Sequence, residues 1–389
     1  MKTTIKSRRI ITPDRILDGF VTFEDGKILS VSGRKPDSDE YIDVGYDYLS
    51  PGFIDIHTHG GAGHDFSGSV NDVIAGVDFH LSHGTTSICP TISAAPFDVM
   101  KSALRSVSKA KRGKKARADI IGAHLEGPYL SAAQCGAQCP DFIKNPDPEE
   151  YLPLVDEFGS DIARWTYAPE NDPDGAFARF LSEHRIVASA GHTNAVGDEM
   201  NTAADNGCKL ITHLYSCTST VTRDHGFRRL GVIETAFLRD DIYVEIIADG
   251  KHLPPDLIRM ILKIKGYDKV ALVTDSLSLA GTDIKRGRMM ATDFIIEDGV
   301  CKLLDRSAFA GSIATSDRLV RVVTEEAGVD IVNAVRMMSY VPARIMGLSK
   351  GAIASGLDAD FVVFGDRIEI KRVFAGGVEV YRNPAEKLR

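Results

Sequence analysis

The feature that most constrains the fold is a regular alternation of apolar, strand-like segments with amphipathic helical segments through the middle of the chain. Most of the apolar runs lack a clean polar alternation, which is typical of parallel strands buried on both faces. Eight strand–helix units over roughly 290 residues predict an α/β fold, a (β/α)8 TIM-type barrel. The predicted strands are Phe53–His59, Thr85–Thr91, Asp119–Glu126, Ile162–Glu170, Ile186–His192, Lys209–Tyr215, Ile242–Ala248 and Lys269–Asp275. The clearest helical patterns between them are Asp72–Ser82, Phe97–Lys109, Ala176–His184, Asn194–Asp205 and Pro255–Ile264.

The last strand–helix unit contains an additional segment. Met289–Leu304 is rich in β-forming residues and has a turn signal at Asp298-Gly299, so we expect a hairpin-like insert there. An open, doubly wound sheet is the alternative to the barrel, but no Gly-x-Gly-x-x-Gly turn follows an early strand.

The two ends of the chain differ from the middle. Both contain short runs of β-formers separated by turn signals, so we expect one small β-sandwich built from both termini. The runs are Thr3–Ile11, Phe20–Glu24, Ile28–Val31, Asp360–Phe364, Glu369–Phe374 and Val378–Tyr381. The predicted domains are a discontinuous β-sandwich, residues 1–52 and 347–389, and a barrel, residues 53–346.

Charge and composition argue against several kinds of partner. The net charge of the 389-residue chain is −8, which argues against a general nucleic-acid-binding protein. No N-terminal apolar run is typical of a signal peptide, and no stretch approaches the roughly 18 apolar residues of a membrane span. The six cysteines are scattered, so we expect a cytoplasmic protein without a disulfide framework. Cys135 and Cys139 could form part of a zinc site or a redox switch, but no second pair completes four ligands, which favours free thiols.

Residues that can bind metals occur at the C-terminal ends of the predicted strands. In a barrel these ends lie on one rim, where active sites are found. The residues are His57 and His59 on the first strand, Glu126 on the third, His192 on the fifth, His213 on the sixth and Asp275 on the eighth. Any single histidine could instead be a core residue bonded to a backbone carbonyl. Together they predict a site for one or two divalent ions, with zinc preferred and iron, manganese or cobalt as alternatives.

Such a site indicates hydrolysis by water. A metal with an open position lowers the pKa of bound water from ~15.7 toward ~7, so no Ser or Cys nucleophile is required. No Gly-x-Ser-x-Gly elbow occurs in the chain. Asp275 is the predicted general base, which accepts a proton from water and returns it to the leaving nitrogen. A metal ligand or a structural aspartate is the alternative, and the roles of ligand and base are compatible.

Several segments resemble the amidohydrolase superfamily and, within it, the N-acetylglucosamine-6-phosphate deacetylases. His-x-His alone is typical of the superfamily, whereas His-Leu-Glu-Gly-Pro together with His-Leu-Tyr and Ala-Asp-Gly-x-His is more specific. The resemblance extends in order over nearly the whole chain. The matching segments are 51–60, 84–86 with 90–91, 124–128, 191–193, 212–215, 248–250 with His252, 273–275, 309–312 and 356–360.

The resemblance implies a homodimeric hydrolase of a linear amide bond, which releases acetate and an amino-sugar 6-phosphate. Asp275 matches the family's catalytic acid/base, and His252 matches a histidine that polarises the carbonyl or holds the ligand. The matching metal ligands are Glu126, His192 and His213 for a shared metal, and His57 and His59 for a second position that only some members have.

Two loops depart from the family pattern. Where the family commonly has Gly-Ala-His, whose histidine contacts the sugar, this chain has Gly136-Ala137-Gln138. Where the family has Asn-Ala, which holds the sugar phosphate, this chain has Ser216-Cys217. Arginines in the following loop could bind phosphate in a bidentate manner, or could form a solvated surface. The predicted substrate-binding residues are His252, Ala137, Gln138, Ser216, Cys217, Arg223, Arg228, Arg229, Ala310 and Gly311.

Three alternatives to this substrate and activity remain. One is another N-acetylhexosamine, with or without phosphate. A second is a cyclic amide, but the enzymes that cleave cyclic amides typically bridge two metals with a carbamylated lysine, and Ile162–Glu170 contains none. The third is a non-catalytic sugar-phosphate sensor on the same fold, against which the complete ligand set and Asp275 argue.

Overall fold

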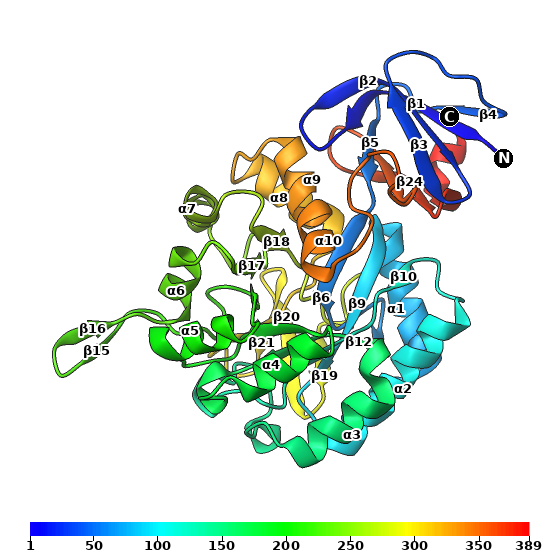
Figure 1. The fold of residues 1–389 in the computed structure, drawn as a ribbon. Coiled ribbons are helices and arrows are strands. Elements are labelled where there is room, and N and C mark those ends of the chain that lie inside the picture. The colour runs from blue at the N-terminus through cyan, green and yellow to red at the C-terminus, as the bar shows by residue number, and fades with distance from the viewer. Residues whose placement is uncertain (389) are drawn as a thin grey trace.

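A computed structural model describes residues 1–388 as a helix-covered barrel beside a smaller β layer (Figure 1). Eight strands form the barrel, and every neighbouring pair among them that shares a ladder is parallel. They are β6 (Phe53–Thr58), β9 (Thr85–Ser93), β11 (Ala123–Glu126), β12 (Ile162–Tyr167), β13 (Val187–Ala190), β14 (Leu210–Ile211), β17 (Tyr243–Ile246) and β18 (Val270–Leu272). Strand β10 (Asp119–Ile120) precedes β11 and pairs with β9. The predicted barrel is confirmed.

The barrel closes between its first strand and the segment that follows its last strand. The backbone N–H of Asp275 donates to the carbonyl of His57 at 2.9 Å, and that of His59 donates to the carbonyl of Ser276 at 2.8 Å. These bonds place Asp275 directly beside His57 on β6 and His59, which follows β6.

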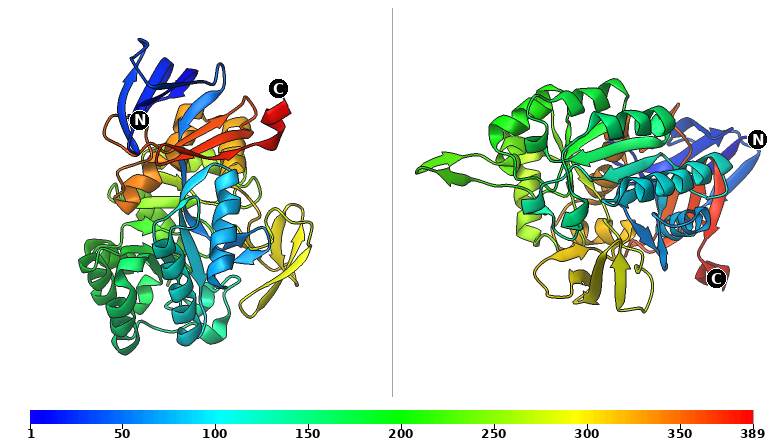
Figure 2. Two further views of the ribbon diagram at one scale, coloured as in Figure 1. Left: turned by 90° about the vertical axis from the view of Figure 1, so that its right-hand side faces the viewer. Right: turned by 90° about the horizontal axis from the view of Figure 1, so that it is seen from below.

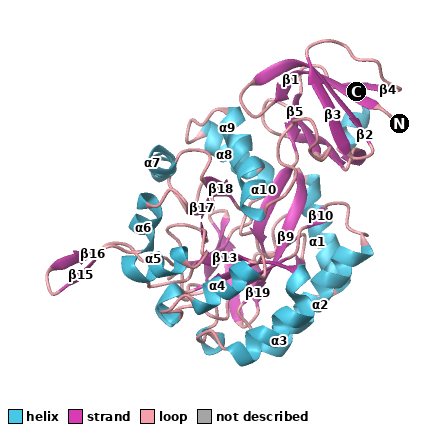
Figure 3. Ribbon diagram, viewed as in Figure 1, coloured by secondary structure: helices cyan, strands magenta, loops and turns pink. Residues whose placement is uncertain are grey.

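Helices cover the outside of the barrel (Figure 3). Helix α1 illustrates why they form: Ser69 and Asp72 make a capping box, and Val73, Val77 and Leu81 repeat every four residues on its buried face. The helices are α1 (Val70–Ser82), α2 (Phe97–Gly113), α3 (Pro148–Phe158), α4 (Ala176–Glu183), α5 (Gly197–Asp205), α6 (Val232–Leu238), α7 (Pro255–Lys265), α8 (Ser316–Glu325), α9 (Ile331–Met338) and α10 (Tyr340–Met346).

The two ends of the chain meet in one eight-stranded sheet, as expected, and the sheet has its own apolar core that includes Ile5, Phe23 and Phe361. Both termini lie in this layer (Figure 1). Its order is β25-β24-β23-β5-β1-β2-β3, with β4 paired to β1. The strands are β1 (Thr3–Ile11), β2 (Ile16–Glu24), β3 (Lys27–Ser32), β4 (Glu40–Asp43), β5 (Tyr48–Pro51), β23 (Phe361–Phe364), β24 (Ile370–Ala375) and β25 (Val378–Arg382).

The predicted insert is larger than a hairpin. It forms a four-stranded antiparallel sheet that stands apart from the helices in Figure 2 (yellow). The turn at Asp298-Gly299 is present, and both residues have positive φ. The strands are β19 (Arg286–Met289), β20 (Thr292–Glu297), β21 (Val300–Leu303) and β22 (Phe309–Gly311).

A second antiparallel hairpin, which the sequence analysis treated only as a loop, projects away from the barrel in both Figure 1 and Figure 2. It consists of β15 (Thr222–Asp224) and β16 (Phe227–Arg229). The short strands β7 (Gly60–Gly61) and β8 (His64–Asp65) form the remaining small sheet. Within the described residues, none of the helices has the length and apolar character needed to cross a membrane.

Candidate metal centre and active site

Three residues from three different strand ends meet at one point of the rim. Glu126 Oε1 lies 3.2 Å from His192 Nε2 and 3.0 Å from His213 Nε2. The two imidazole nitrogens are themselves 3.1 Å apart. Three buried ligand atoms that converge in this way are the arrangement expected around a cation.

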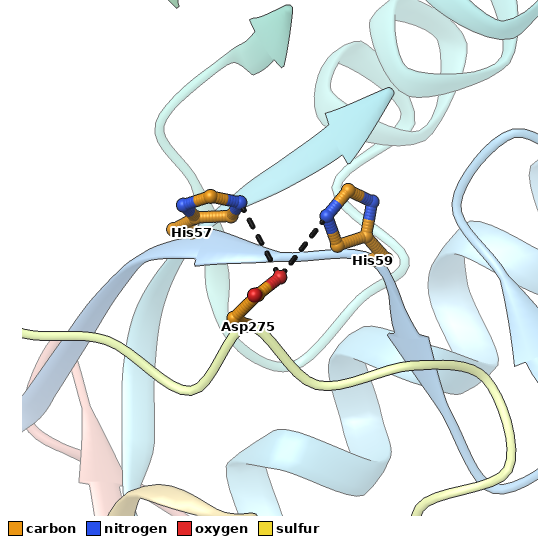
Figure 4. A group of neighbouring side chains, drawn as sticks. All are labelled: His57, His59 and Asp275. Carbon is orange, nitrogen blue, oxygen red and sulfur yellow. Dashed lines mark ion pairs between the residues drawn. The ribbon is translucent and has the colours of Figure 1, made fainter. Parts of the chain in front are cut away.

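A second group lies next to the first. Asp275 Oδ1 is 3.5 Å from His57 Nε2 and 3.2 Å from His59 Nε2, and all three side chains point toward one another (Figure 4). His57 lies on β6 and His59 directly follows this strand, and the two side chains lie on the same side of the chain, as their spacing of two residues predicted.

Glu126 connects the two groups. Its Oε1 lies 3.3 Å from His57 Nε2, and its Oε2 lies 3.3 Å from His59 Nε2. One carboxylate therefore contacts all four histidines, and it would lie between two ions if both clusters held metal.

The backbone at this rim adopts a conformation that L-residues rarely take. His192, His213 and Asp275 have φ of 46°, 32° and 45°, in the left-handed region. Non-glycine residues held in this region cost free energy, and they cluster at functional sites where the surrounding fold imposes them. Here the bend lies two or three residues beyond the end of each strand and directs the side chain into the site.

Each of three histidines has its second ring nitrogen fixed by an oxygen. Nδ1 of His59 lies 3.0 Å from Ser93 Oγ, and Nδ1 of His192 and His213 lie 3.0 and 3.1 Å from the carbonyls of Gln134 and Ser216. A ring that donates its Nδ1–H to a carbonyl presents the lone pair of Nε2 to the site. This is the tautomer that a metal requires.

The charges of the rim also fit a cation. Burial disfavours the charged form of His57, but the carboxylates of Glu126 and Asp275 outweigh it and raise its pKa to about 10. Burial would also lower the pKa of His59, but its hydrogen bonds to Asp275 and Glu126 outweigh burial and raise this pKa to about 9. Burial would raise the pKa of Glu126, yet the surrounding histidines hold it well below its usual value. The carboxylates thus require positive charge between them, which a divalent cation supplies.

A cavity of about 260 Å³ opens onto this rim, with His59, Glu126, His192, His213 and Asp275 in its wall. Seven of the predicted substrate residues also line it: Ala137, Gln138, Ser216, Cys217, His252, Ala310 and Gly311. The insert supplies Ala310 and Gly311 from β22 and also brings Met289 and Phe309 to the wall, to which the sequence patterns gave no role.

Gln138 contacts the metal cluster itself. Its Nε2 donates to Glu126 Oε2 at 2.8 Å, while its Oε1 accepts from the backbone N–H of Ala94 at 3.0 Å. The amide is buried, so in this arrangement it orients Glu126.

The predicted phosphate-binding arginines lie elsewhere. Arg223, Arg228 and Arg229 are on the projecting hairpin, and Arg229 pairs with Asp224 on the same hairpin. Among the described residues that line the cavity, none is Lys or Arg. The structure therefore does not bring these arginines into the pocket of their own chain.

Asp249 is a site residue that the sequence analysis did not assign, although it lies in the Ala-Asp-Gly-x-His segment. Its Oδ2 lies 2.9 Å from His252 Nδ1, and its Oδ1 accepts from the backbone N–H of His252. Burial would raise the pKa of Asp249, but the bonds from His252 lower it overall. The His252 ring is thereby fixed with Nε2 as the nitrogen available to a ligand in the pocket.

A barrel whose strand ends gather two histidine–carboxylate clusters beside a pocket defines a hydrolase of the metal-site class. The chain belongs to the amidohydrolase family, because the sequence model of that family matches residues 48–380. It is 32% identical over 377 residues to an N-acetylglucosamine-6-phosphate deacetylase of Bacillus subtilis, with 94% of each chain covered. It is 30% identical over 354 residues to that of Danio rerio, with 89% of this chain and 87% of the relative covered.

Solved structures agree with these sequence comparisons. N-acetylglucosamine-6-phosphate deacetylase from Pasteurella multocida superimposes with a TM-score of 0.91 at 28% identity, covering 98% of this chain and 100% of that one. A mutant of the Mycobacterium smegmatis deacetylase in complex with N-acetyl-D-glucosamine-6-phosphate gives a TM-score of 0.90 at 27% identity, covering 97% and 99%. The family expected from the sequence motifs is confirmed.

Proposed function

We propose that this protein is a metal-dependent deacetylase that hydrolyses N-acetylglucosamine 6-phosphate to glucosamine 6-phosphate and acetate. The observation that carries the proposal is the pair of histidine–carboxylate clusters, bridged by Glu126 and opening with Asp275 onto one pocket. The deacetylase names of the relatives from Bacillus subtilis and Danio rerio support the choice of reaction and substrate.

The two clusters and Asp275 have different roles in the proposed reaction. The histidines and carboxylates of the two clusters would hold divalent cations, which would lower the pKa of water and polarise an amide carbonyl. Asp275 accepts the proton from the attacking water on its carboxylate and then donates it to the leaving amine nitrogen. Asp275 is suited to this exchange because its carboxylate contacts His57 and His59 and lines the pocket.

His252 is the residue that we assign to the substrate. Asp249 fixes the ring through Nδ1, so that Nε2 can hold the carbonyl oxygen or a sugar hydroxyl. Ser216 and Cys217, in place of the family's Asn-Ala, lie along the same wall and contact the part of the sugar that faces them.

We propose zinc as the metal, with iron, manganese and cobalt as alternatives, and two ions per chain, because the two clusters offer separate ligand sets. Elemental analysis of protein purified without added metal tests both statements. Cytoplasmic localisation stays a prediction, which the six free cysteines support.

Acetate release tests the function. Metal-loaded protein is expected to release acetate from N-acetylglucosamine 6-phosphate faster than from N-acetylglucosamine, N-acetylgalactosamine or their other phosphates. Faster turnover of another N-acetylhexosamine would transfer the proposal to that sugar, the alternative that Ser216 and Cys217 support. No acetate from any member of the panel contradicts the proposal.

We further propose a homodimer in which the projecting hairpin of each subunit supplies the phosphate-binding charge of its partner. The support is that the pocket wall contains no Lys or Arg among the described residues, while three arginines lie on the hairpin. A phosphate needs such charge, and Arg provides it in a bidentate manner.

Subunit mixing tests this arrangement. One inactive variant is Asp275→Asn, and the other replaces Arg223, Arg228 and Arg229 by Ala. In a random mixture, about a quarter of the sites combine an intact Asp275 with an intact partner hairpin, so about a quarter of the activity is expected to return. If each hairpin serves its own pocket, the mixture stays inactive.

A further inference from the structure

A fully buried ion pair lies inside the barrel, next to the metal ligands, and has no part in the reaction described above. We propose that this pair, Arg164 and Glu245, is a positioning device for His57 and thereby determines whether the second metal ion is bound. The inference rests on the proposed metal-dependent function and adds to it two residues to which the sequence analysis gave no role.

The pair is completely enclosed. Both side chains are 0% exposed, with Arg164 on β12 and Glu245 on β17. The guanidinium contacts both carboxylate oxygens: Nη1 donates to Oε1, and Nη2 lies 3.3 Å from Oε2. This is the bidentate geometry that holds a carboxylate in one orientation.

Arg164 also fixes the strand that carries His57. Its Nη1 donates to the carbonyl of Ile56 at 3.1 Å, and its Nη2 donates to Thr212 Oγ1 at 3.0 Å. One guanidinium therefore holds both Glu245 and the backbone of β6 immediately before the ligand.

Glu245 faces the ring of His57 on the side away from the metal site. Its Oε2 lies 3.5 Å from Nδ1, whereas Nε2 of the same ring faces Glu126 and Asp275. Within the described part of the chain, neither nitrogen of His57 has a partner that meets hydrogen-bond geometry, although both are buried. A ring whose Nδ1–H is attracted to Glu245 presents its Nε2 lone pair to the second cluster.

This environment differs from that of the other ligands. The outer nitrogens of His59, His192 and His213 meet a hydroxyl or a backbone carbonyl, which are uncharged. Only His57, among the four, has a carboxylate behind it. A carboxylate behind a metal-binding imidazole fixes its tautomer and makes it a stronger donor, and loss of such a partner typically weakens metal binding about 10- to 100-fold.

The cost of the pair supports a functional role. Removing two charges from water is unfavourable, and apolar residues of similar volume are often as stable or more stable in such a position. Strand interiors of these barrels are usually filled by apolar residues. The ion pair is therefore a poor choice for stability alone and a good one for orienting a histidine.

The test separates metal binding from stability. Glu245→Gln keeps the shape of the side chain but leaves Arg164 buried and unpaired, so the variant is expected to be less stable. The double variant Arg164→Met with Glu245→Leu removes both charges, and its stability is expected to recover toward that of the wild type. Thr212→Val is the control, because it removes a partner of Arg164 without changing Glu245 or His57.

The measurements are zinc and cobalt content, stepwise cobalt affinity followed by visible absorption, and melting temperature. The wild type and Thr212→Val are expected to bind two equivalents. In the double variant the first equivalent is expected to bind normally and the second about 10- to 100-fold more weakly, despite recovered stability. In Glu245→Gln the amide oxygen can still accept from Nδ1–H of His57. The affinity of this variant for the second ion is expected to lie between those of the wild type and the double variant.

Two results would overturn the inference. Wild-type affinity for both ions in the double variant would show that His57 needs no carboxylate. Weakening of both ions together, in proportion to lost stability, would assign the pair a structural role only. Neither result depends on acetate release. A wild-type protein that binds two ions but releases no acetate would contradict the proposed reaction and leave the role of the ion pair unaffected.

Discussion

Asp275 is the residue on which the proposed chemistry depends most. Its side chain is only 12% exposed and lies against His57 and His59, yet it lines the cavity. It can therefore act on a bound substrate while remaining fixed by its neighbours. Its backbone, with φ of 45°, is imposed by the bonds that close the barrel.

Replacing Asp275 by Asn separates proton transfer from metal binding. The Glu126, His192 and His213 cluster is untouched, so the variant is expected to retain the ion of that cluster while kcat falls by ~10²–10⁴-fold. His192→Ala, which removes a ligand of that cluster, is expected to lose metal. Elemental analysis beside acetate release distinguishes the two, and equal metal loss in both variants would make Asp275 chiefly a ligand.

His80 makes the stability of the protein depend on pH. The ring is fully buried, its Nε2 lies 2.9 Å from the carbonyl of Gly60, and burial lowers its pKa to about 4. Because the folded pKa is below the unfolded value of about 6.5, the unfolded state binds more protons between these pH values. The contribution of His80 to folding is therefore complete above pH ~6.5 and falls as the pH decreases toward 4.

The variant His80→Gln tests this directly. Glutamine can also donate to the Gly60 carbonyl, but it does not titrate. The decrease in the free energy of unfolding between pH 7 and pH 5 is expected to be smaller in the variant than in the wild type. Identical decreases, measured by urea denaturation, would mean that His80 does not contribute.

At the scale of elements, the sequence predicted the strand ends that matter. His57, Glu126 and Asp275 could be assigned because apolar runs end abruptly at polar residues there. Most of the strands are shorter than predicted, although β9 extends two residues further, to Ser93. Strand β14 contains only Leu210 and Ile211, because the backbone turns into the left-handed region at His213.

Other elements had no clear signal. The four-stranded insert was predicted as a single hairpin, because β19 and β22 are short and pair only through the hairpin between them. The role of Gln138 depends on a contact with Glu126 across the rim, and Arg164 meets Glu245 from a strand 81 residues away. Such long-range contacts are not encoded in local periodicity.

The projecting hairpin gives a prediction about assembly. Phe227 is 78% exposed at its end, and Val221 and Leu230 beside it are also exposed. In the proposed dimer a second subunit would cover this apolar group, so we expect Phe227→Ser to shift the protein from dimer to monomer. Val378→Ser, at a position 63% exposed on β25, is the matched control and should leave the dimer intact. Light scattering after size-exclusion chromatography measures the mass of each variant in solution. A Phe227→Ser variant that remains a dimer would contradict the assignment of this hairpin to the dimer interface.

At the scale of the whole molecule, the barrel and the terminal sheet followed from the order of strand-like and helix-like segments. The exact division at residues 52/53 and 346/347 stays a prediction. The structure adds that four barrel strands, β6, β11, β13 and β14, lead directly into the histidine and carboxylate ligands. Binding of the proposed metal would therefore be coupled to folding of the barrel.

This coupling predicts a stabilisation by metal. An ion that binds only the folded protein stabilises it by about 2.7 kcal/mol at a concentration 100 times its Kd. Chelation is expected to lower the melting temperature of the wild type and to have little effect on His192→Ala. An unchanged melting temperature of the wild type after complete chelation would indicate that no ion links the strand ends.

The most direct measurement is a titration of metal-depleted protein with zinc or cobalt, with acetate release from N-acetylglucosamine 6-phosphate followed at each step. Activity is expected to be absent at the start and to rise until the bound metal saturates, while Asp275→Asn binds an ion at the Glu126, His192 and His213 cluster without comparable turnover. Undiminished acetate release from protein shown to be free of metal, or no release from fully loaded protein, would contradict the proposed function.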